Sequence, residues 1–250
     1  PFDLEVPENL DVVDAVVHGN AQRDEDYWPL RSVMGLGNVN GVFPPDTEGD
    51  VGPDHYFLMI NSSFAIYSKE GIKLYGPADN STLWDGFPGP WSSTNDGDPI
   101  VVYDEGADRW FASQFAVHTN DGSFWELVAI SETGDPLGAW YRYAFEFNYF
   151  NDYPKFGVWH NAYLGTFNYF NSSATSYVGG GAVALERDAM LAGDPDARMI
   201  VFPISNSKYG ILPADYDGTP PPSDEPAWFA HINRTGNKQL EIWKADINWN

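Results

Sequence analysis

The apolar residues of this chain fall in short runs that alternate with polar positions and end at turn residues. Such runs occupy positions 56–60, 64–67, 72–75, 100–103, 109–115, 125–130 and 140–147, and they are rich in aromatic and β-branched residues. This pattern predicts β-strands. Segments such as Ser68-Lys69-Glu70-Gly71 and Asn120-Asp121-Gly122 are typical of the turns between antiparallel neighbours. The sequence therefore predicts an all-β fold built from hairpins.

The same pattern continues through the second half of the chain. Apolar runs follow at 156–159, 162–167, 182–185 and 240–244, and a further strand is expected at 12–17. One segment, 187–192, has helical character and is followed by Gly193, a common residue after a helix end. Two Pro-rich stretches, 76–97 and 215–226, are expected to be loops.

A short phrase, an acidic residue next to a proline, precedes several of these groups of strands. It recurs from Asp50 to Asp98 after 48 residues, to Asp152 after 54, and to Glu225 after 73. The phrases read Gly49-Asp50-Val51-Gly52-Pro53, Gly97-Asp98-Pro99, Asp152-Tyr153-Pro154 and Asp224-Glu225-Pro226. A period of 40–55 residues with four strands per unit is typical of a propeller blade. We therefore expect a β-propeller of four-stranded antiparallel blades.

The spacing divides the chain into an arm and about four blades. The arm covers 1–40, and the blades cover about 41–97, 98–151, 152–214 and 215–250. Two interpretations remain open: a small four-bladed ring, or part of a longer polypeptide whose propeller is incomplete here.

Composition narrows the choice of partners. Thirteen basic and 36 acidic residues give a formal charge of −23, which repels nucleic acid and anionic lipid. No stretch approaches twenty uninterrupted apolar residues, so no membrane span is expected. The absence of cysteine excludes disulfides and thiolate metal sites. The start, Pro1-Phe2-Asp3, indicates a processed terminus, and we expect a secreted or cell-surface protein.

Three segments resemble signatures of large secreted microbial β-propeller proteins without an assigned activity. The resemblance covers roughly residues 40–245, and it implies a propeller that continues beyond this chain. The segments are Pro44-Pro45-Asp46-Thr47-Glu48-Gly49-Asp50-Val51-Gly52-Pro53-Asp54-His55-Tyr56, Gly97-Asp98-Pro99-Ile100-Val101-Val102-Tyr103-Asp104 and Asp152-Tyr153-Pro154-Lys155-Phe156-Gly157-Val158-Trp159.

A weaker resemblance is to sialidase-type propellers, whose blades carry a Ser-x-Asp-x-Gly-x-x-Trp turn. The segment from Ser131 to Trp140 holds the same residue types at a different spacing. This resemblance supports the fold but not the activity, because one fold serves many functions.

Acidic residues offer two kinds of site. Calcium requires six to eight oxygen ligands, and the closely spaced acids Asp46, Glu48, Asp50 and Asp54 predict one calcium site. The alternative is that Asp46 and Asp50 accept hydrogen bonds from turn amides.

The repeated acids could instead meet at the centre of the propeller. If each phrase opens an innermost strand, then Asp50, Asp98, Asp152 and Glu225 surround one end of the central channel. Propeller glycosidases use such carboxylates as acid and base. The alternative is that each acid caps backbone amides at a blade start, and the repetition favours this structural role, so no catalytic residue is assigned outright.

Aromatic rings on loops form the third candidate. Trp84, Phe87 and Trp91 lie in the loop 76–97, and Tyr149 and Tyr153 lie near the third phrase. Exposed rings there could stack on sugars or anchor a partner. The alternative is that they cover the edge of the core.

Four sequons predict glycosylation if the protein is exported from a glycosylating cell. They start at Asn61, Asn80, Asn171 and Asn233. Outside such a cell they carry no information.

Three hypotheses for function follow. The leading one is an extracellular propeller that binds a glycan or protein at a cell surface, or assembles, without catalysis, since the few arginines are scattered. The second is a carbohydrate-active enzyme with inner-strand carboxylates. The third is a filament subunit that pairs with other copies of itself through the strand near Trp243 and the arm at 12–17.

Overall fold

The first sheet of the molecule is a four-stranded antiparallel meander. The computed structural model describes residues 32–205, 207–233 and 239–250, of which 34–250 belong to one compact unit. The sheet contains β1 (Glu48–Val51), β2 (His55–Ile60), β3 (Ser63–Ser68) and β4 (Lys73–Asp79) in that spatial order. A short 3₁₀ helix, η2 (Asn80–Trp84), follows it. We refer to this sheet as blade 1.

Two further four-stranded meanders follow, with neighbours in space also neighbours in sequence. Blade 2 contains β5 (Gly97–Asp104), β6 (Arg109–Ala116), β7 (Phe124–Ser131) and β8 (Trp140–Phe147). Blade 3 contains β9 (Phe150–Val158), β10 (Ala162–Phe170), β11 (Tyr177–Glu186) and β12 (Met199–Ser205). The predicted helix is confirmed as α1 (Arg187–Leu191), which connects β11 to β12.

The fourth sheet, blade 4, has three strands among the described residues: β13 (Leu212–Pro213), β14 (Ala227–Ile232) and β15 (Leu240–Ala245). It begins at Leu212, slightly before the expected boundary at 215. The sequence pattern predicted β15 but not β13 or β14, and it also missed β1 and β12. The predicted strand at 12–17 lies outside the described residues.

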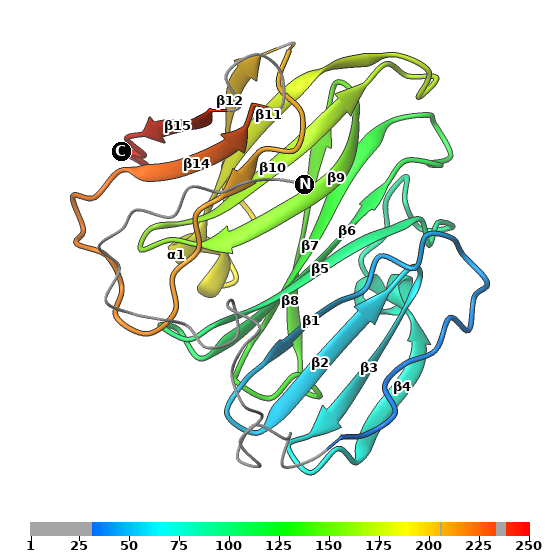
Figure 1. Cartoon of the computed structure of the whole chain (residues 1–250). Coiled ribbons are helices and arrows are strands. Elements are labelled where there is room, and N and C mark those ends of the chain that lie inside the picture. Colours follow the sequence, from blue (N-terminus) through cyan, green and yellow to red (C-terminus); the bar gives the residue numbers. More distant parts are fainter. Residues whose placement is uncertain (1–31, 206, 234–238) are drawn as a thin grey trace, which may run out of the picture. The chain divides into compact units, whose positions relative to one another are not determined.

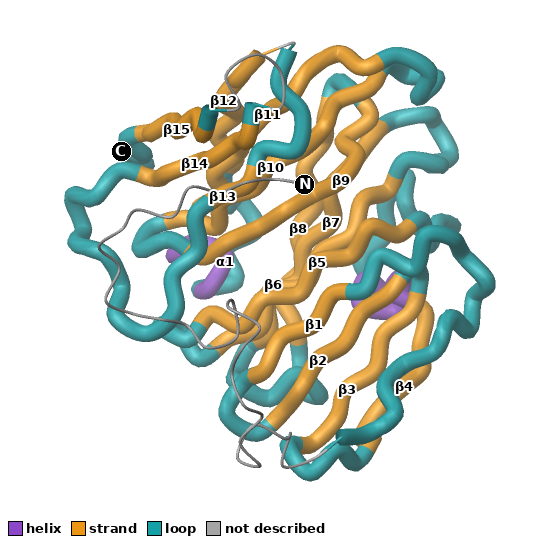
Figure 2. Tube along the Cα trace, in the orientation of Figure 1, coloured by secondary structure: helices purple, strands orange, loops and turns teal. Residues whose placement is uncertain are grey.

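The first strand of each sheet contacts the first strand of the next. These contacts join β1 to β5, β5 to β9, and β9 to β13. Figure 1 shows the sheets following one another along the chain, from β1–β4 in blue and cyan to β14 and β15 in orange and red. Figure 2 shows the strands that form each blade. Consecutive antiparallel meanders joined through their innermost strands form a β-propeller, so the predicted fold is confirmed.

The core lies between the blades, and strand alternation explains why both faces of a blade are apolar. The adjacent residues Trp110 and Phe111 on β6 are both fully buried. Trp110 packs against Phe57 of blade 1, with ring centroids 5.8 Å apart, whereas Phe111 packs against Tyr163 of blade 3 at 5.0 Å. Each residue therefore faces a different neighbouring blade.

A buried ion pair joins blades 2 and 3. Asp104, at the end of β5, is fully buried and accepts hydrogen bonds from Arg187 Nε at 2.6 Å and Nη2 at 2.8 Å. The Tyr163 hydroxyl donates to the same carboxylate at 2.9 Å. Because both carboxylate oxygens have partners, the pair offsets part of the cost of burying its charges.

Blades 3 and 4 approach each other closely at Gly157 of β9. A Cβ atom at this position would lie 2.4 Å from the backbone oxygen of Ala214, which cannot move independently of β13.

We expect Gly157→Ala to lower the free energy of unfolding by about 1–3 kcal/mol, the usual cost of overpacking. Urea denaturation measures this effect. Gly37→Ala is the control, because a Cβ there meets no heavy atom within 4 Å. Equal stability of the two variants would contradict the close approach.

One face of blade 4 is apolar and exposed. Leu212, Ala230 and Ile242 lie opposite one another in the strand register, and Ile232 and Leu240 flank them. Ile232, Leu240 and Ile242 are each about 60% exposed. The opposite face, which includes Trp243, packs against blade 3. The Trp243 side chain is partly buried against blade 3, whereas Ile242 on the same strand is exposed, so pairing between copies through this strand stays a prediction.

Among the described residues, no helix combines the length and apolar character needed to cross a membrane.

Candidate functional site

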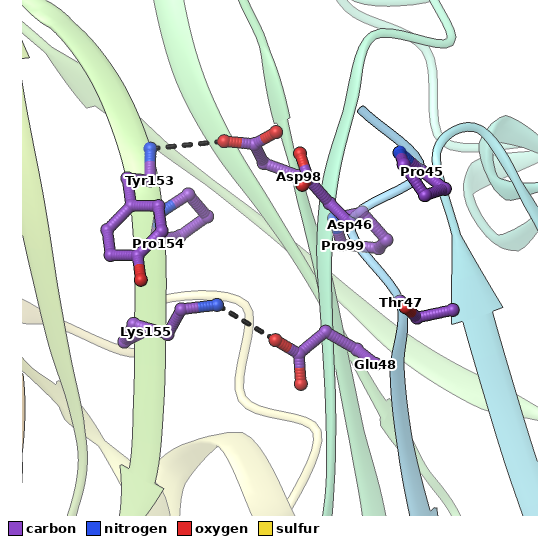
Figure 3. Close-up of a pocket in the computed structure, with 9 residues that line it drawn as sticks. All are labelled: Pro45, Asp46, Thr47, Glu48, Asp98, Pro99, Tyr153, Pro154 and Lys155. Atoms are coloured by element: carbon purple, nitrogen blue, oxygen red, sulfur yellow. Dashed lines mark hydrogen bonds and ion pairs between the residues drawn. The ribbon is translucent and has the colours of Figure 1, made fainter. Parts of the chain in front are cut away.

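A pocket of about 360 Å³ opens beside the first strands of blades 1, 2 and 3. Figure 3 shows the residues that line it, which come from segments more than a hundred positions apart in the sequence. They are Pro45, Asp46, Thr47, Glu48, Asp98, Pro99, Tyr153, Pro154 and Lys155. The pocket thus collects the acid–proline phrases of two blades and a Pro-Asp pair of the third.

Blades 1, 2 and 3 each contribute one non-glycine residue with left-handed backbone to this pocket. The φ angles are 35° at Asp46, 43° at Asp98 and 55° at Tyr153. A left-handed conformation costs roughly 1–2 kcal/mol for an L-residue, less for Asp than for Tyr. Strain of this kind persists where the surrounding structure imposes it, and it commonly accompanies functional sites.

The buried amide of Asn61 links two of the acids. Its Nδ2 donates to Asp46 Oδ2 at 2.9 Å and to the Pro44 carbonyl at 3.1 Å, and its Oδ1 accepts from the Asp98 backbone N–H at 2.6 Å. A Cβ on Gly97 would lie 2.4 Å from the same Oδ1 atom. Glycine at 97 therefore allows Asn61 to hold Asp98 beside Asp46.

The environment of Asp98 favours its protonated form. Burial, the charge of Asp152, and a hydrogen bond and charge from Asp46 together raise the pKa of Asp98 to about 7. The Tyr153 backbone N–H, which donates to Asp98 Oδ2 at 3.1 Å, opposes this shift only in part. Burial also raises the pKa of Asp152, as does the charge of Asp46. Asp98 thus keeps its proton to a higher pH than an ordinary carboxyl group and lies beside two further acids, an arrangement suited to acid–base chemistry.

Among the residues that the structure describes, Lys155 is the one cation that lines the pocket. Its Nζ forms an ion pair with Glu48 of β1 at 2.8 Å and lies 4.8 Å from the centre of the Tyr153 ring. Figure 3 shows this pair below the Asp98–Tyr153 contact. Because Glu48 neutralises Lys155, the remaining charge of the pocket is negative.

The structure brings together only part of the predicted acid group. Asp98 and Asp152 are near each other, as expected, but the third acid is Asp46 instead of Asp50. Asp50 lies further along β1, where its Oδ2 accepts from the Tyr103 backbone N–H of β5 at 2.7 Å. Asp215 makes a similar link to the Val158 N–H of β9 at 2.6 Å. Asp50 therefore has the predicted structural role: its Oδ1 accepts from the Val51 N–H of its own strand at 2.7 Å, and its Oδ2 links this strand to the next blade.

The prediction that Glu225 joins the central acids is wrong. It precedes β14, whereas the first strand of blade 4 is β13. Its Oε1 accepts from Trp228 Nε1 at 2.8 Å, and its carbonyl accepts from Trp159 Nε1 at 3.3 Å. Glu225 thus holds the connection between β13 and β14 against the end of β9.

The residues predicted to bind calcium do not surround one point. Glu48 and Asp50 lie on the extended strand β1, where alternate residues are roughly 7 Å apart. Glu48 pairs with Lys155, Asp46 with Asn61, and Asp50 with backbone N–H groups, while Asp54 is exposed. No group of three or more His, Asp or Glu side chains in the described part of the chain could hold a metal ion. Calcium binding stays a prediction without geometric support.

The predicted ligand-binding aromatics fall into two groups. Tyr149 and Tyr153 are each 45% exposed, and Tyr153 lines the pocket. Trp84 and Trp91 are buried in the core between blades 1 and 2, and Phe87 is half-buried against them. The expectation of exposed rings in the loop 76–97 is therefore wrong, because that loop folds over the edge of the core.

The asparagines of the four sequons differ in burial: two are buried and two are half-buried. Asn61 and Asn80 are 4% and 0% exposed, and their amide groups donate to protein oxygens, so a glycan at either is incompatible with the fold. This corrects the prediction for these two positions. Asn171 and Asn233 are half-buried, and glycosylation there stays a prediction.

Sequence reasoning missed a buried acid beside the site. Glu126 of β7 is 1% exposed, and its Oε2 accepts from Asn151 Nδ2 at 3.0 Å. Burial raises the pKa of Glu126 well above its usual value, and the charge of Asp98 adds to the effect. Asn151 precedes Asp152 in β9, so Glu126 positions the segment that carries that acid. A single acid within the apolar run 125–130 was the available signal.

Glu126 gives a stability prediction with a definite sign. Since the folded pKa lies above the unfolded one, its stabilising contribution is complete below about pH 4.5 and is lost as the pH rises. Glu126→Gln stays uncharged and can still accept from Asn151. We expect the variant to be more stable than the wild type at pH 8 and nearly equal to it at pH 4. Urea denaturation across this range tests the sign, and a wild-type advantage at pH 8 would refute it.

Comparisons with known proteins do not assign the chain to a family. No family model and no curated protein matches it. Among solved structures, it is similar to a GH43_1 enzyme from Xanthomonas citri, also solved with xylotriose, at 12% identity and a TM-score of 0.42, covering 82% of this chain and 71% of that one. A GH43 endo-arabinanase from Bacillus licheniformis shows 11% identity and a TM-score of 0.25, covering 82% and 94%. These similarities are too distant to assign an activity.

Proposed function

We propose that the protein is a carbohydrate-active enzyme that hydrolyses glycosidic bonds in the pocket between blades 1, 2 and 3. The observation that carries this proposal is Asp98, a carboxyl group with a pKa of about 7 beside Asp46 and Asp152. Glycoside hydrolysis needs one carboxylic acid to protonate the leaving oxygen and one carboxylate to activate water or attack the sugar. Asp98 supplies the acid and Asp152 supplies the carboxylate, while Asp46, which is hydrogen-bonded to Asp98, helps to keep the proton on Asp98.

The charge of the pocket selects the class of substrate. Among the described lining residues, the three acids Asp46, Glu48 and Asp98 face one lysine, which is already paired with Glu48. Such a surface repels uronic and sialic acids and favours neutral sugars. The exposed ring of Tyr153 offers a face on which a sugar can stack. The substrate is therefore a neutral oligosaccharide or polysaccharide.

This proposal reverses the order of the hypotheses drawn from the sequence. The sequence favours a binding role without catalysis because its arginines are scattered and its repeated acids are alike. In the structure their surroundings differ: Asp50 bonds to a backbone N–H of the adjacent strand, whereas Asp98 shares its surroundings with two other acids. Unlike carboxylates in one place are what acid–base catalysis requires.

Product release from neutral glycans tests the proposal. The purified chain is incubated with xylan, arabinan, β-glucan, mannan and starch, and with trisaccharides including xylotriose, at pH 5–7, and the products are separated by chromatography. We expect release from at least one substrate, and loss of that release in Asp98→Asn. If every neutral substrate stays intact, the proposed hydrolysis is refuted.

Assembly is a second candidate, favoured by the exposed apolar face of blade 4 formed by Leu212, Ile232, Leu240 and Ile242. Contiguous apolar surface of this kind commonly marks an interaction site. Secretion or cell-surface location fits both candidates and stays part of the proposal. We expect light scattering to show association that Ile242→Glu abolishes. A monomer at all concentrations would eliminate this candidate.

A further inference from the structure

A second pocket, of about 380 Å³, lies where η2 and the loop after it cover β6 and β7 of blade 2. Its lining includes Trp84, Phe87, Trp91, Thr94, Gln114 and Leu127. None of the described residues that line it also lines the pocket between blades 1, 2 and 3. We refer to it as the Gln114 pocket.

The polar atoms of the Gln114 side chain are buried without hydrogen bonds to the described part of the fold. Gln114 lies on β6 opposite Leu127 and is fully buried. Neither its Nε2 nor its Oε1 has a hydrogen-bond partner among the residues that the structure describes, and the same holds for Trp84 Nε1. An unpaired buried polar group costs about 1–3 kcal/mol. The pocket therefore presents two donor groups and one acceptor that a ligand could satisfy.

The aromatic part of the pocket is held in place by its own loop. Phe87 and Trp91 stack with centroids 5.5 Å apart, and Trp91 meets Trp125 edge-on at 4.9 Å. Trp91 Nε1 donates to the Phe87 carbonyl at 3.0 Å. A Cβ on Gly89 would lie 2.3 Å from the Trp91 ring, so glycine lets the loop close over it. The rings are thus fixed before any ligand arrives.

We propose that the Gln114 pocket binds one unit of a neutral saccharide. A sugar hydroxyl both donates and accepts, which matches an amide with a free N–H and a free C=O. The C–H face of a sugar ring can pack on the half-buried ring of Phe87, which stacks on Trp91. In the described part of the chain, no lysine or arginine lines the pocket and Asp85 is its one acidic residue, so anionic ligands are disfavoured. This site is independent of the proposed catalysis, because it uses other residues.

The test measures binding in a background without hydrolysis. Calorimetric titration uses Asp98→Asn with xylotriose, arabinotriose, cellotriose, mannotriose and maltotriose, and Trp fluorescence follows the rings near the pocket. We expect at least one trisaccharide to bind, and Gln114→Leu to weaken it at least tenfold. Leucine has nearly the same size and needs no partner, so this variant should also unfold at a higher temperature than its parent.

Asn148→Leu is the matched control, because it replaces an exposed amide outside this pocket. It should leave the affinity unchanged. Binding that is unaffected by Gln114→Leu would place the saccharide elsewhere and overturn the proposal. Absence of binding for all five sugars would also overturn it, leaving water as the partner of Gln114. Either result is separable from catalysis, since hydrolysis by the wild type is measured independently.

Discussion

Asp98→Asn should reduce kcat/KM on the responsive glycan by about 10²–10⁴-fold, the usual contribution of a general acid. Asparagine has nearly the same shape, tolerates the left-handed backbone at this position and cannot supply the proton. The measurement is the rate of reducing-end release at several pH values. In the wild type, kcat/KM should fall as the pH rises through about 7, because Asp98 loses its proton there.

The matched control for this variant is Asp50→Asn. Asp50 also lies along a first strand and also accepts a hydrogen bond from the next strand, but it does not line the pocket. We expect its kcat/KM to stay within a few-fold of the wild type. The free energy of unfolding distinguishes loss of the acid from loss of the fold. Because burial and neighbouring acids raise the pKa of Asp98, Asp98→Asn should be more stable than the wild type at pH 8. Equal activity of Asp98→Asn and wild type would refute the acid role.

Asp104→Ala should lower the free energy of unfolding by about 3–5 kcal/mol, the typical cost of removing one partner of a buried ion pair. It leaves the buried Arg187 charge and the Tyr163 hydroxyl without their acceptor. Chemical denaturation, followed by Trp fluorescence, measures the loss. The double variant Asp104→Leu with Arg187→Met removes both charges, and it should recover most of the lost stability.

The exposed pair between Glu186 and Arg198 is the control for this prediction. Arg198 is about half exposed, and its Nη2 lies 2.6 Å from Glu186 Oε1. Solvent screens such a pair, so Glu186→Gln should leave stability nearly unchanged. A small effect of Asp104→Ala, comparable to that of Glu186→Gln, would show that blades 2 and 3 do not depend on the buried pair.

The blades could be predicted from the sequence because their signals are local. Alternation along 109–115 and the turn at Asn120-Asp121-Gly122 specify a hairpin without reference to the rest of the chain. Strand β13 was missed because it has two residues, one of them proline, and β14 was missed because it follows a long Pro-rich loop. Short strands of this kind are defined by their partners more than by their own pattern.

The candidate site could be predicted only in part, because it depends on register between blades. Asp98 and Asp152 were identified from their repeat. Asp46 and Asp50 are both candidates for the equivalent acid in blade 1, and only the position of β1 against β5 distinguishes them. Glu126 and Gln114 belong to apolar strands, and their importance depends on partners that lie far away in sequence or are missing.

The left-handed backbone at Asp46, Asp98 and Tyr153 sets a conflict for anyone who engineers this protein. Glycine relaxes such a conformation, so a selection for heat tolerance would accept glycine at all three positions. Two of those exchanges delete an acid and the third deletes the ring beside them. Substitutions at these three positions that raise thermal stability would therefore lower catalytic turnover. Libraries meant to improve both properties should keep the three positions fixed.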